Sequence, residues 1–166
     1  STNVETVQSF KLLGVHISHD LTWSTHIDFI TTKASQRIHH ISLLKRAGIN
    51  PSDILEMYTS GVRPILEYAS PVWHPGLTGQ IVKEVEHVQK RVLKCIFPNC
   101  DYYEALSKAN IETLHERRVK ECTKVFTAMQ TTTHKLNYLL PNTRQIPYRI
   151  RNQKAFPLPN LKTIHT

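Results

Sequence analysis

Basic side chains recur at helical spacing in one segment of this sequence, so binding of an anion is the first chemistry to consider. In residues 78–97 the apolar residues alternate at intervals of three and four, which predicts an amphipathic helix. The opposite face carries a row of basic and titratable side chains with Arg91 at its edge: Lys83, His87, Lys90 and Lys94. Ammonium groups at helical pitch can follow the phosphates of one nucleic-acid strand without reading its bases. The alternative is an ordinary solvated face, because Glu84 and Glu86 are neighbours in sequence.

A second row of basic side chains flanks the apolar edge of an earlier predicted helix. It consists of Lys33, Arg37 and His40. In the last long predicted helix, three further basic residues share a face: Arg117, Lys120 and Lys124. Arg118 falls near the apolar side of that helix instead, so we expect it to bind a carboxylate or a carbonyl group.

Two patterns imitate metal sites. His26 and Asp28 match the His-x-Asp half of a non-haem iron site, but they lie where a helix begins, whereas such sites belong to closed β-folds. The second pattern has a loose spacing for zinc: Cys95, Cys100, His115 and Cys122. Because Cys95 and Cys122 fall on apolar helical faces, the pattern favours buried thiols, and we expect no metal ion in this chain.

The elements that must position these residues are mostly helical. Residues 10–17 predict a strand, with Gly14 as a bulge. A helix is expected from Thr25, with Thr25 and Asp28 as a capping box and Gly48 as its stop. Four more helices are expected: one after Pro51 with a kink near Val62, one over 78–97, a short one after Asp101, and one capped by Thr113 and Glu116.

The sequence thus predicts a mostly α fold in which a small β element precedes a bundle of about five helices. Trp73, Tyr58 and Tyr68 are expected in its core, and in the last helix Val119, Cys122, Phe126 and Met129 are expected to face inward. We expect three segments: a β element over 1–23, a helical domain over 24–131 and an irregular basic tail over 132–166.

Composition indicates an intracellular protein, nuclear or cytoplasmic, with a polyanionic partner. The net charge is +8, and residues 84–166 hold fourteen Lys and Arg against seven Asp and Glu. Such asymmetry favours binding to phosphates. Three irregularly spaced cysteines suit a reducing compartment, and no apolar run or leader predicts membrane insertion or secretion.

Several short motifs, in the same order along the chain, resemble one family. They are Phe10-Lys11-Leu12-Leu13-Gly14-Val15-His16-Ile17, then Asp20-Leu21-Thr22-Trp23, and Arg63-Pro64-Ile65-Leu66-Glu67-Tyr68-Ala69-Ser70-Pro71-Val72-Trp73. The sequences around 31–48, 88–94, 114–118 and 148–159 are similar to later parts of the same family. Together they resemble the region C-terminal to the catalytic palm in reverse transcriptases of non-LTR (LINE-type) retrotransposons.

The resemblance implies an RNA-directed DNA polymerase whose catalytic part lies elsewhere. Residues 10–17 would be the primer grip, with Lys11 and Gly14 near the primer end, and the basic row of Lys33, Arg37 and His40 would lie on the thumb near the duplex. The implied partners are an RNA–DNA hybrid or another nucleic acid, and the palm and fingers of the parent polymerase. Polymerase catalysis needs clustered carboxylates that hold divalent metals, and the family has an adjacent Asp-Asp pair. No such pair exists here, so this chain alone should be inactive, with metal expected only in the palm.

Two other functions stay open. The chain can be a helical protein-interaction module or an inactive remnant of such an element, since Leu12 stands where the family commonly has an aromatic residue. The third hypothesis is a region similar to the N-terminal part of an AlkB-type DNA-repair protein, on the stretch that contains His26 and Asp28.

Overall fold

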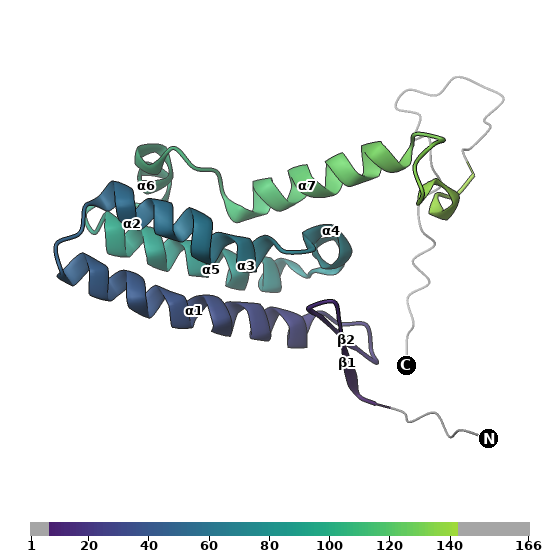
Figure 1. Cartoon of the computed structure of the whole chain (residues 1–166), viewed down its shortest axis with the longest axis horizontal. Helices are drawn as coiled ribbons and strands as arrows, with labels where there is room; N and C mark the ends of the chain where they lie inside the picture. Colours follow the sequence, from purple (N-terminus) through teal and green to yellow (C-terminus); the bar gives the residue numbers. More distant parts are fainter. Residues whose placement is uncertain (1–6, 143–166) are drawn as a thin grey trace. The chain divides into compact units, whose positions relative to one another are not determined.

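The N-terminal element is a β-hairpin. The computed structural model describes residues 7–142, in which β1 (Ser9–Leu12) pairs antiparallel with β2 (Val15–Ser18), Leu12 opposite Val15. Leu13 and Gly14 form the turn with φ angles of 47° and 88°, the left-handed pair that a two-residue hairpin turn requires. The prediction of one strand over 10–17 with a bulge at Gly14 is therefore wrong, because the chain reverses there (Figure 1).

Helix α1 (Ser24–Arg46) follows, and its inward face is the predicted one. Every third or fourth residue is at most 4% exposed: Ile27, Ile30, Ala34, Ile38 and Ile41. The helix begins at Ser24, so Thr25 lies inside the first turn and the predicted capping box with Asp28 does not form. It ends at Arg46, two residues before the predicted stop Gly48, whose φ of 78° lets Ile49 N donate to the Leu44 carbonyl.

The second helical segment is bent. It comprises α2 (Pro51–Met57), the π-helical turn η1 (Tyr58–Val62) and α3 (Arg63–Glu67). The π-helical turn lies where the kink near Val62 is predicted, and Pro64 has no N–H to continue the α-helical pattern. The short elements α4 (Ser70–Trp73) and η2 (His74–Gly76) then lead to α5.

Helices α5 (Gly79–Ile96), α6 (Tyr102–Ala109) and α7 (Leu114–Met129) begin where the sequence predicts. Thr78 caps α5, Asp101 and Glu104 form a capping box on α6, and Thr113 and Glu116 form one on α7. On α5 the central valines of the predicted apolar stripe, Val85, Val88 and Val92, are at most 3% exposed.

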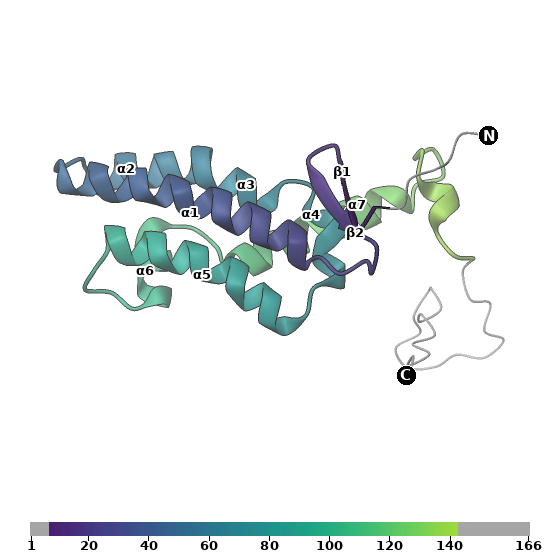
Figure 2. The same ribbon diagram turned by 90° about the horizontal axis from the view of Figure 1, so that it is seen from below.

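The part of the chain that the structure describes is mostly helical, with a two-stranded sheet followed by five main helical segments, as predicted. The described residues divide into two units, with the boundary between Thr123 and Lys124. In the first unit, α1, the bent α2–α3 segment and α5 run side by side around Tyr58 and Trp73 (Figures 1 and 2). In the second, η3 (Asn137–Leu139) follows α7, and residues 143–166 of the predicted tail lie outside the described residues, as do residues 1–6 of the predicted β element.

Two predictions about buried side chains are wrong. On α7, Val119 and Phe126 are 42% and 43% exposed, whereas Leu114 and Arg118 are fully buried. The buried residues of α7 lie near its N-terminus, where the backbone N–H groups of Leu114 and His115 are bonded to Glu86 of α5. Tyr68 is also exposed, and its hydroxyl donates to the Leu13 carbonyl of the hairpin at 2.9 Å.

A buried polar network joins α5 to three other elements. The Glu86 carboxylate accepts hydrogen bonds from the backbone N–H groups of Leu114 and His115, at 3.1 and 3.0 Å, and from the Tyr102 hydroxyl. Gln89 accepts a bond from the Tyr58 hydroxyl at 2.6 Å and donates to Tyr102 Oη and the Glu112 carbonyl, both at 3.0 Å. A carboxylate at a helix N-terminus also stabilises the helix dipole.

Replacing Glu86→Gln should lower the free energy of unfolding by about 2 kcal/mol, because the amide cannot accept all three hydrogen bonds at this buried site. The matched control is Glu84→Gln on the exposed face of α5, which should change stability by less than about 0.5 kcal/mol. Urea denaturation of both variants measures the difference. Equal stabilities would contradict the structural role of Glu86.

Candidate nucleic-acid interface

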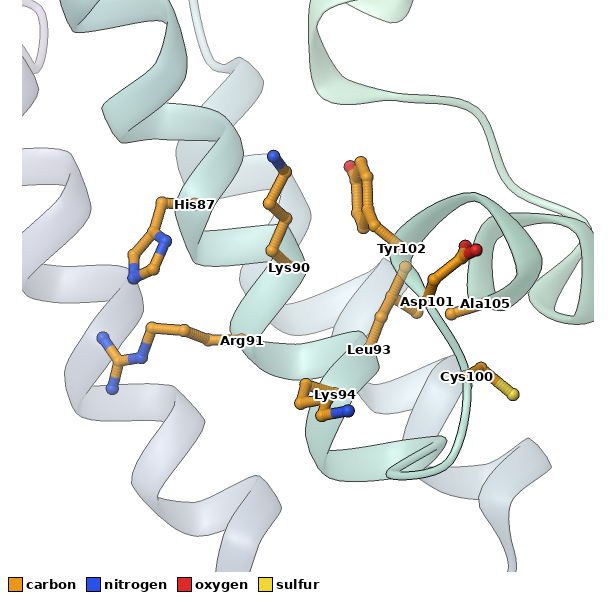
Figure 3. A pocket seen from close by; sticks show the side chains of 9 residues that line it. All are labelled: His87, Lys90, Arg91, Leu93, Lys94, Cys100, Asp101, Tyr102 and Ala105. Atoms are coloured by element: carbon orange, nitrogen blue, oxygen red, sulfur yellow. The ribbon is translucent and has the colours of Figure 1, made fainter.

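The predicted basic row on α5 is exposed along its whole length. We call it the α5 basic row: Lys83, His87, Lys90, Arg91 and Lys94. Figure 3 shows His87 and Arg91 directed toward the neighbouring helix α1 and Lys90 directed toward Tyr102 on α6. The Arg91 guanidinium donates to the Ser35 hydroxyl of α1 at 3.3 Å. The row thus lies between two helices that pack on either side of α5.

Four members of this row border a cavity of about 360 Å³ between α5 and α6, which we call the α5–α6 cavity. Lys83 is the member that does not line it. The inner wall is formed by Leu93, Cys100, Tyr102 and Ala105, and the Asp101 carboxylate at the rim accepts the N–H of Glu104 at 2.8 Å. Leu93, Cys100 and Ala105 also belong to a small core cluster beneath the cavity. The cavity is therefore apolar inside and basic at its edge (Figure 3).

The charges of the α5 basic row are not neutralised by carboxylates. Within residues 7–142 the ion pairs join Arg63 and Arg117 to Glu67, and Lys120 to Glu112. Lys94 donates instead to the Pro98 carbonyl at 2.6 Å, and Lys90 Nζ lies 5.0 Å from the centroid of the Tyr102 ring. These neutral partners leave a positive potential available to an anion.

The hairpin and α1 bring three further predicted residues together. Lys11, Gly14 and Lys33 line a cavity of about 340 Å³ that also contains Phe29. The ammonium groups of Lys11 and Lys33 lie 4.9 and 5.9 Å from the centroid of the Phe29 ring. Gly14 is required by the turn, and a Cβ atom there would lie 3.3 Å from Tyr68 Cε1. Lys11 and Gly14 from the predicted primer grip and Lys33 from the predicted thumb row thus form a second basic site with an aromatic floor.

Arg37 and His40 line a third cavity, of about 300 Å³, beside the π-helical turn. Arg37 Nη1 donates to the Gly61 carbonyl at 3.0 Å, so this guanidinium supports the bent helix. The structure therefore distributes the ten predicted residues over three places along the described chain.

Sequence reasoning missed the aromatic residues at these sites. Tyr102 borders the α5–α6 cavity and Phe29 lies under two lysines. Phe29 precedes Lys33 by four residues, a spacing that places the two side chains next to each other on a helix. No comparable local pattern connects Lys90 with Tyr102, because they come from different helices.

Arg118 is the centre of a separate buried cluster. Its Nε donates to His74 Nδ1 at 3.3 Å, and its guanidinium carbon lies 5.8 Å from the centroid of the Trp73 ring. This differs from the predicted carboxylate or carbonyl partner. Burial, followed by the charge of Arg118 and by His115, lowers the pKa of His74 from 6.5 to about 4. Trp73 is completely buried, so it belongs to the core.

The residues that imitate metal sites lie in ordinary structural positions. His26 is buried and accepts the backbone N–H of His16 at 3.4 Å, whereas Asp28 is exposed. Burial, and secondarily His16, lowers the pKa of His26. Cys100 accepts from Lys108, Cys95 lies near Ser42, and Cys122 lies near the Ser70 carbonyl. No group of three or more possible metal-ligating side chains occurs in residues 7–142.

Comparison of the chain with known protein families, with curated proteins and with solved structures gives no match. None of the helices in the described range is both long and apolar enough to cross a membrane.

The His74 environment predicts a loss of stability in acid. Because the pKa of His74 is lower in the folded state, the unfolded chain binds its proton first, and stability falls as the pH decreases from about 6.5 toward 4. His74→Asn should reduce that loss by about 1–2 kcal/mol, since the shift is removed. Chemical denaturation between pH 7 and 4 measures it, with exposed His39→Asn as the control. The same slope in both variants would contradict the assignment.

Proposed function

We propose that this chain is the thumb and C-terminal region of a reverse transcriptase of the non-LTR retrotransposon type. Its role is to hold the RNA–DNA hybrid through contacts to the phosphate backbone, inside the nucleus or cytoplasm. The palm and fingers of the parent polymerase would add nucleotides and hold the divalent metals. No catalytic step is assigned to this chain.

The α5 basic row is the observation that carries this proposal. From Lys83 to Lys94 it extends about 16 Å at the helical rise of 1.5 Å per residue. Phosphates of one strand are about 3.4 Å apart along a duplex axis, so the row can follow roughly four or five of them. Its side chains are exposed and make no ion pair within the described residues, which favours release of counterions from a polyanion.

The hairpin site supports the same function. Lys11, Gly14 and Lys33 come from two elements but share one cavity. In the proposal, the lysines bind phosphates near the primer end, while the tight turn at Gly14 positions the hairpin. The contact between Tyr68 and Leu13 ties this turn to the bent α2–α3 segment.

A helical protein-interaction module is the second candidate, active or as a remnant of such an element. The hairpin favours it, because Phe10, Leu12 and Leu13 are 59%, 50% and 83% exposed. Neighbouring apolar side chains of this size mark contact surfaces for other proteins. Such binding would depend on these side chains and little on salt concentration.

Reversing Lys83, Lys90 and Lys94 together to Glu tests the leading proposal. The variant should bind every RNA–DNA hybrid at least about tenfold more weakly at low salt, because three phosphate contacts become repulsive. The dependence of log affinity on log salt should become shallower by about three. Fluorescence anisotropy with two unrelated hybrid sequences across a salt series measures both quantities.

The matched control variant replaces Lys120, Lys124 and Lys135 by Glu, which changes the net charge equally. These three residues lie outside the three basic sites. It should weaken binding much less than the α5 variant. A loss confined to one hybrid sequence, or an equal loss in both variants, would contradict backbone contact by α5. Absence of hybrid binding by the unmodified chain would leave the protein-interaction module.

A further inference from the structure

We propose that the α5–α6 cavity holds one unpaired nucleobase next to the phosphates that the α5 basic row contacts. This inference rests on the proposed function and adds a ligand class to it. Contacts to a regular duplex backbone need only exposed cations. Lys83 is such a cation, because it is the member of the row that does not line the cavity. Lys90 and Lys94 instead stand at the edge of a concave apolar site, which duplex phosphates do not use, whereas His87 and Arg91 are directed toward α1.

The lining of the cavity has two parts that match the two parts of a nucleotide. Tyr102 provides an aromatic wall, and the buried residues Leu93 and Ala105 form the apolar base beneath it. Lys90 and Lys94 stand at the edge, where a phosphate attached to an inserted base would lie (Figure 3). Sites that bind single strands combine these features, an aromatic surface for the base and cations for the backbone. The volume, about 360 Å³, falls in the range of small-molecule sites.

Tyr102 is held rigidly enough to act as a stacking surface. Its hydroxyl donates to Glu86 and accepts from Gln89 Nε2 at 3.0 Å. Both of these partners lie on the core side of α5. A ring that is already fixed loses little conformational freedom when a base stacks on it.

The ammonium of Lys90 now occupies the neighbourhood of the Tyr102 ring, at 5.0 Å from its centroid. Such a contact is worth only about 0.5–1 kcal/mol at an exposed site, whereas stacking of a base on an aromatic side chain is worth about 1–3 kcal/mol. Entry of a base therefore displaces Lys90 at small cost and makes its charge available to the adjacent phosphate.

The other polar groups at the cavity do not oppose this ligand. The Asp101 carboxylate is engaged in the capping box of α6, with Glu104 N at 2.8 Å. The Cys100 sulfur accepts from Lys108 at 3.0 Å, which adds a cation on the α6 side. The charge around the opening is therefore positive overall and complements a nucleotide.

The test compares two ligands that differ only in the base. Both are RNA–DNA hybrids with a single-nucleotide overhang, which carries 2-aminopurine in one and an abasic residue in the other. Because the phosphates are equal in number, backbone contact alone predicts equal affinities. The cavity predicts about tenfold tighter binding of the 2-aminopurine hybrid and a change in its fluorescence on stacking, measured by titration.

The variant Ala105→Leu fills the cavity from α6 and should abolish the difference between the two hybrids while the salt dependence remains. The control is Tyr103→Leu, which removes an aromatic ring that is 76% exposed on the same helix and should preserve the difference. Thermal unfolding shows whether each variant is folded. If a variant does not fold, the binding of the two hybrids by the unmodified chain still tests the cavity.

Each outcome separates the inference from the proposed function. Equal, salt-dependent binding of both hybrids overturns the base site and leaves the backbone grip in place. Loss of the difference in Tyr103→Leu, with Ala105→Leu unaffected, overturns it as well, because the base then stacks outside the cavity. If neither hybrid binds, both proposals fail.

Discussion

Glu86 and Gln89, both buried on α5, bind polar groups of three neighbouring helical segments. One carboxylate and one amide on α5 satisfy the first N–H groups of α7, the Glu112 carbonyl and the hydroxyls of Tyr58 and Tyr102. A buried polar group without its partners costs more than its hydrogen bonds contribute, so these five groups specify one arrangement of α5 against α2–α3, α6 and α7. The apolar contacts of the valine stripe would tolerate several such arrangements.

Helix α5 therefore has a different role on each of its faces. The valine stripe enters the main core, Glu86 and Gln89 connect the surrounding helices, and the α5 basic row faces outward. Since the row belongs to a helix held by a buried network, its cations keep a defined spacing along one helical face. The same network fixes Tyr102 at the edge of the row. The buried hydrogen bonds and the candidate binding site therefore share this residue.

Much of the fold could be predicted because its signals are local. Capping residues at Thr78, Asp101 and Thr113 mark helix starts through contacts with residues three positions later, and Gly48 ends a helix by its own backbone conformation. The turn of the hairpin is not predictable from the sequence, because Leu13 adopts a left-handed conformation in which its residue type is uncommon. The inward face of α7 was misjudged because its orientation follows from Glu86, which is remote in sequence.

The helical periods, the kink near Val62 and the basic rows can be predicted from the sequence, because each follows from side-chain types at short, regular intervals. The sequence also shows that the cations outnumber the carboxylates in the second half of the chain. The packing of the helices decides which cations share a site, places Arg37 on the Gly61 carbonyl and forms the apolar cavity beside Lys90. The physical reason is that a cavity and its aromatic wall form between helices, where side chains distant in sequence meet through packing that no local pattern encodes.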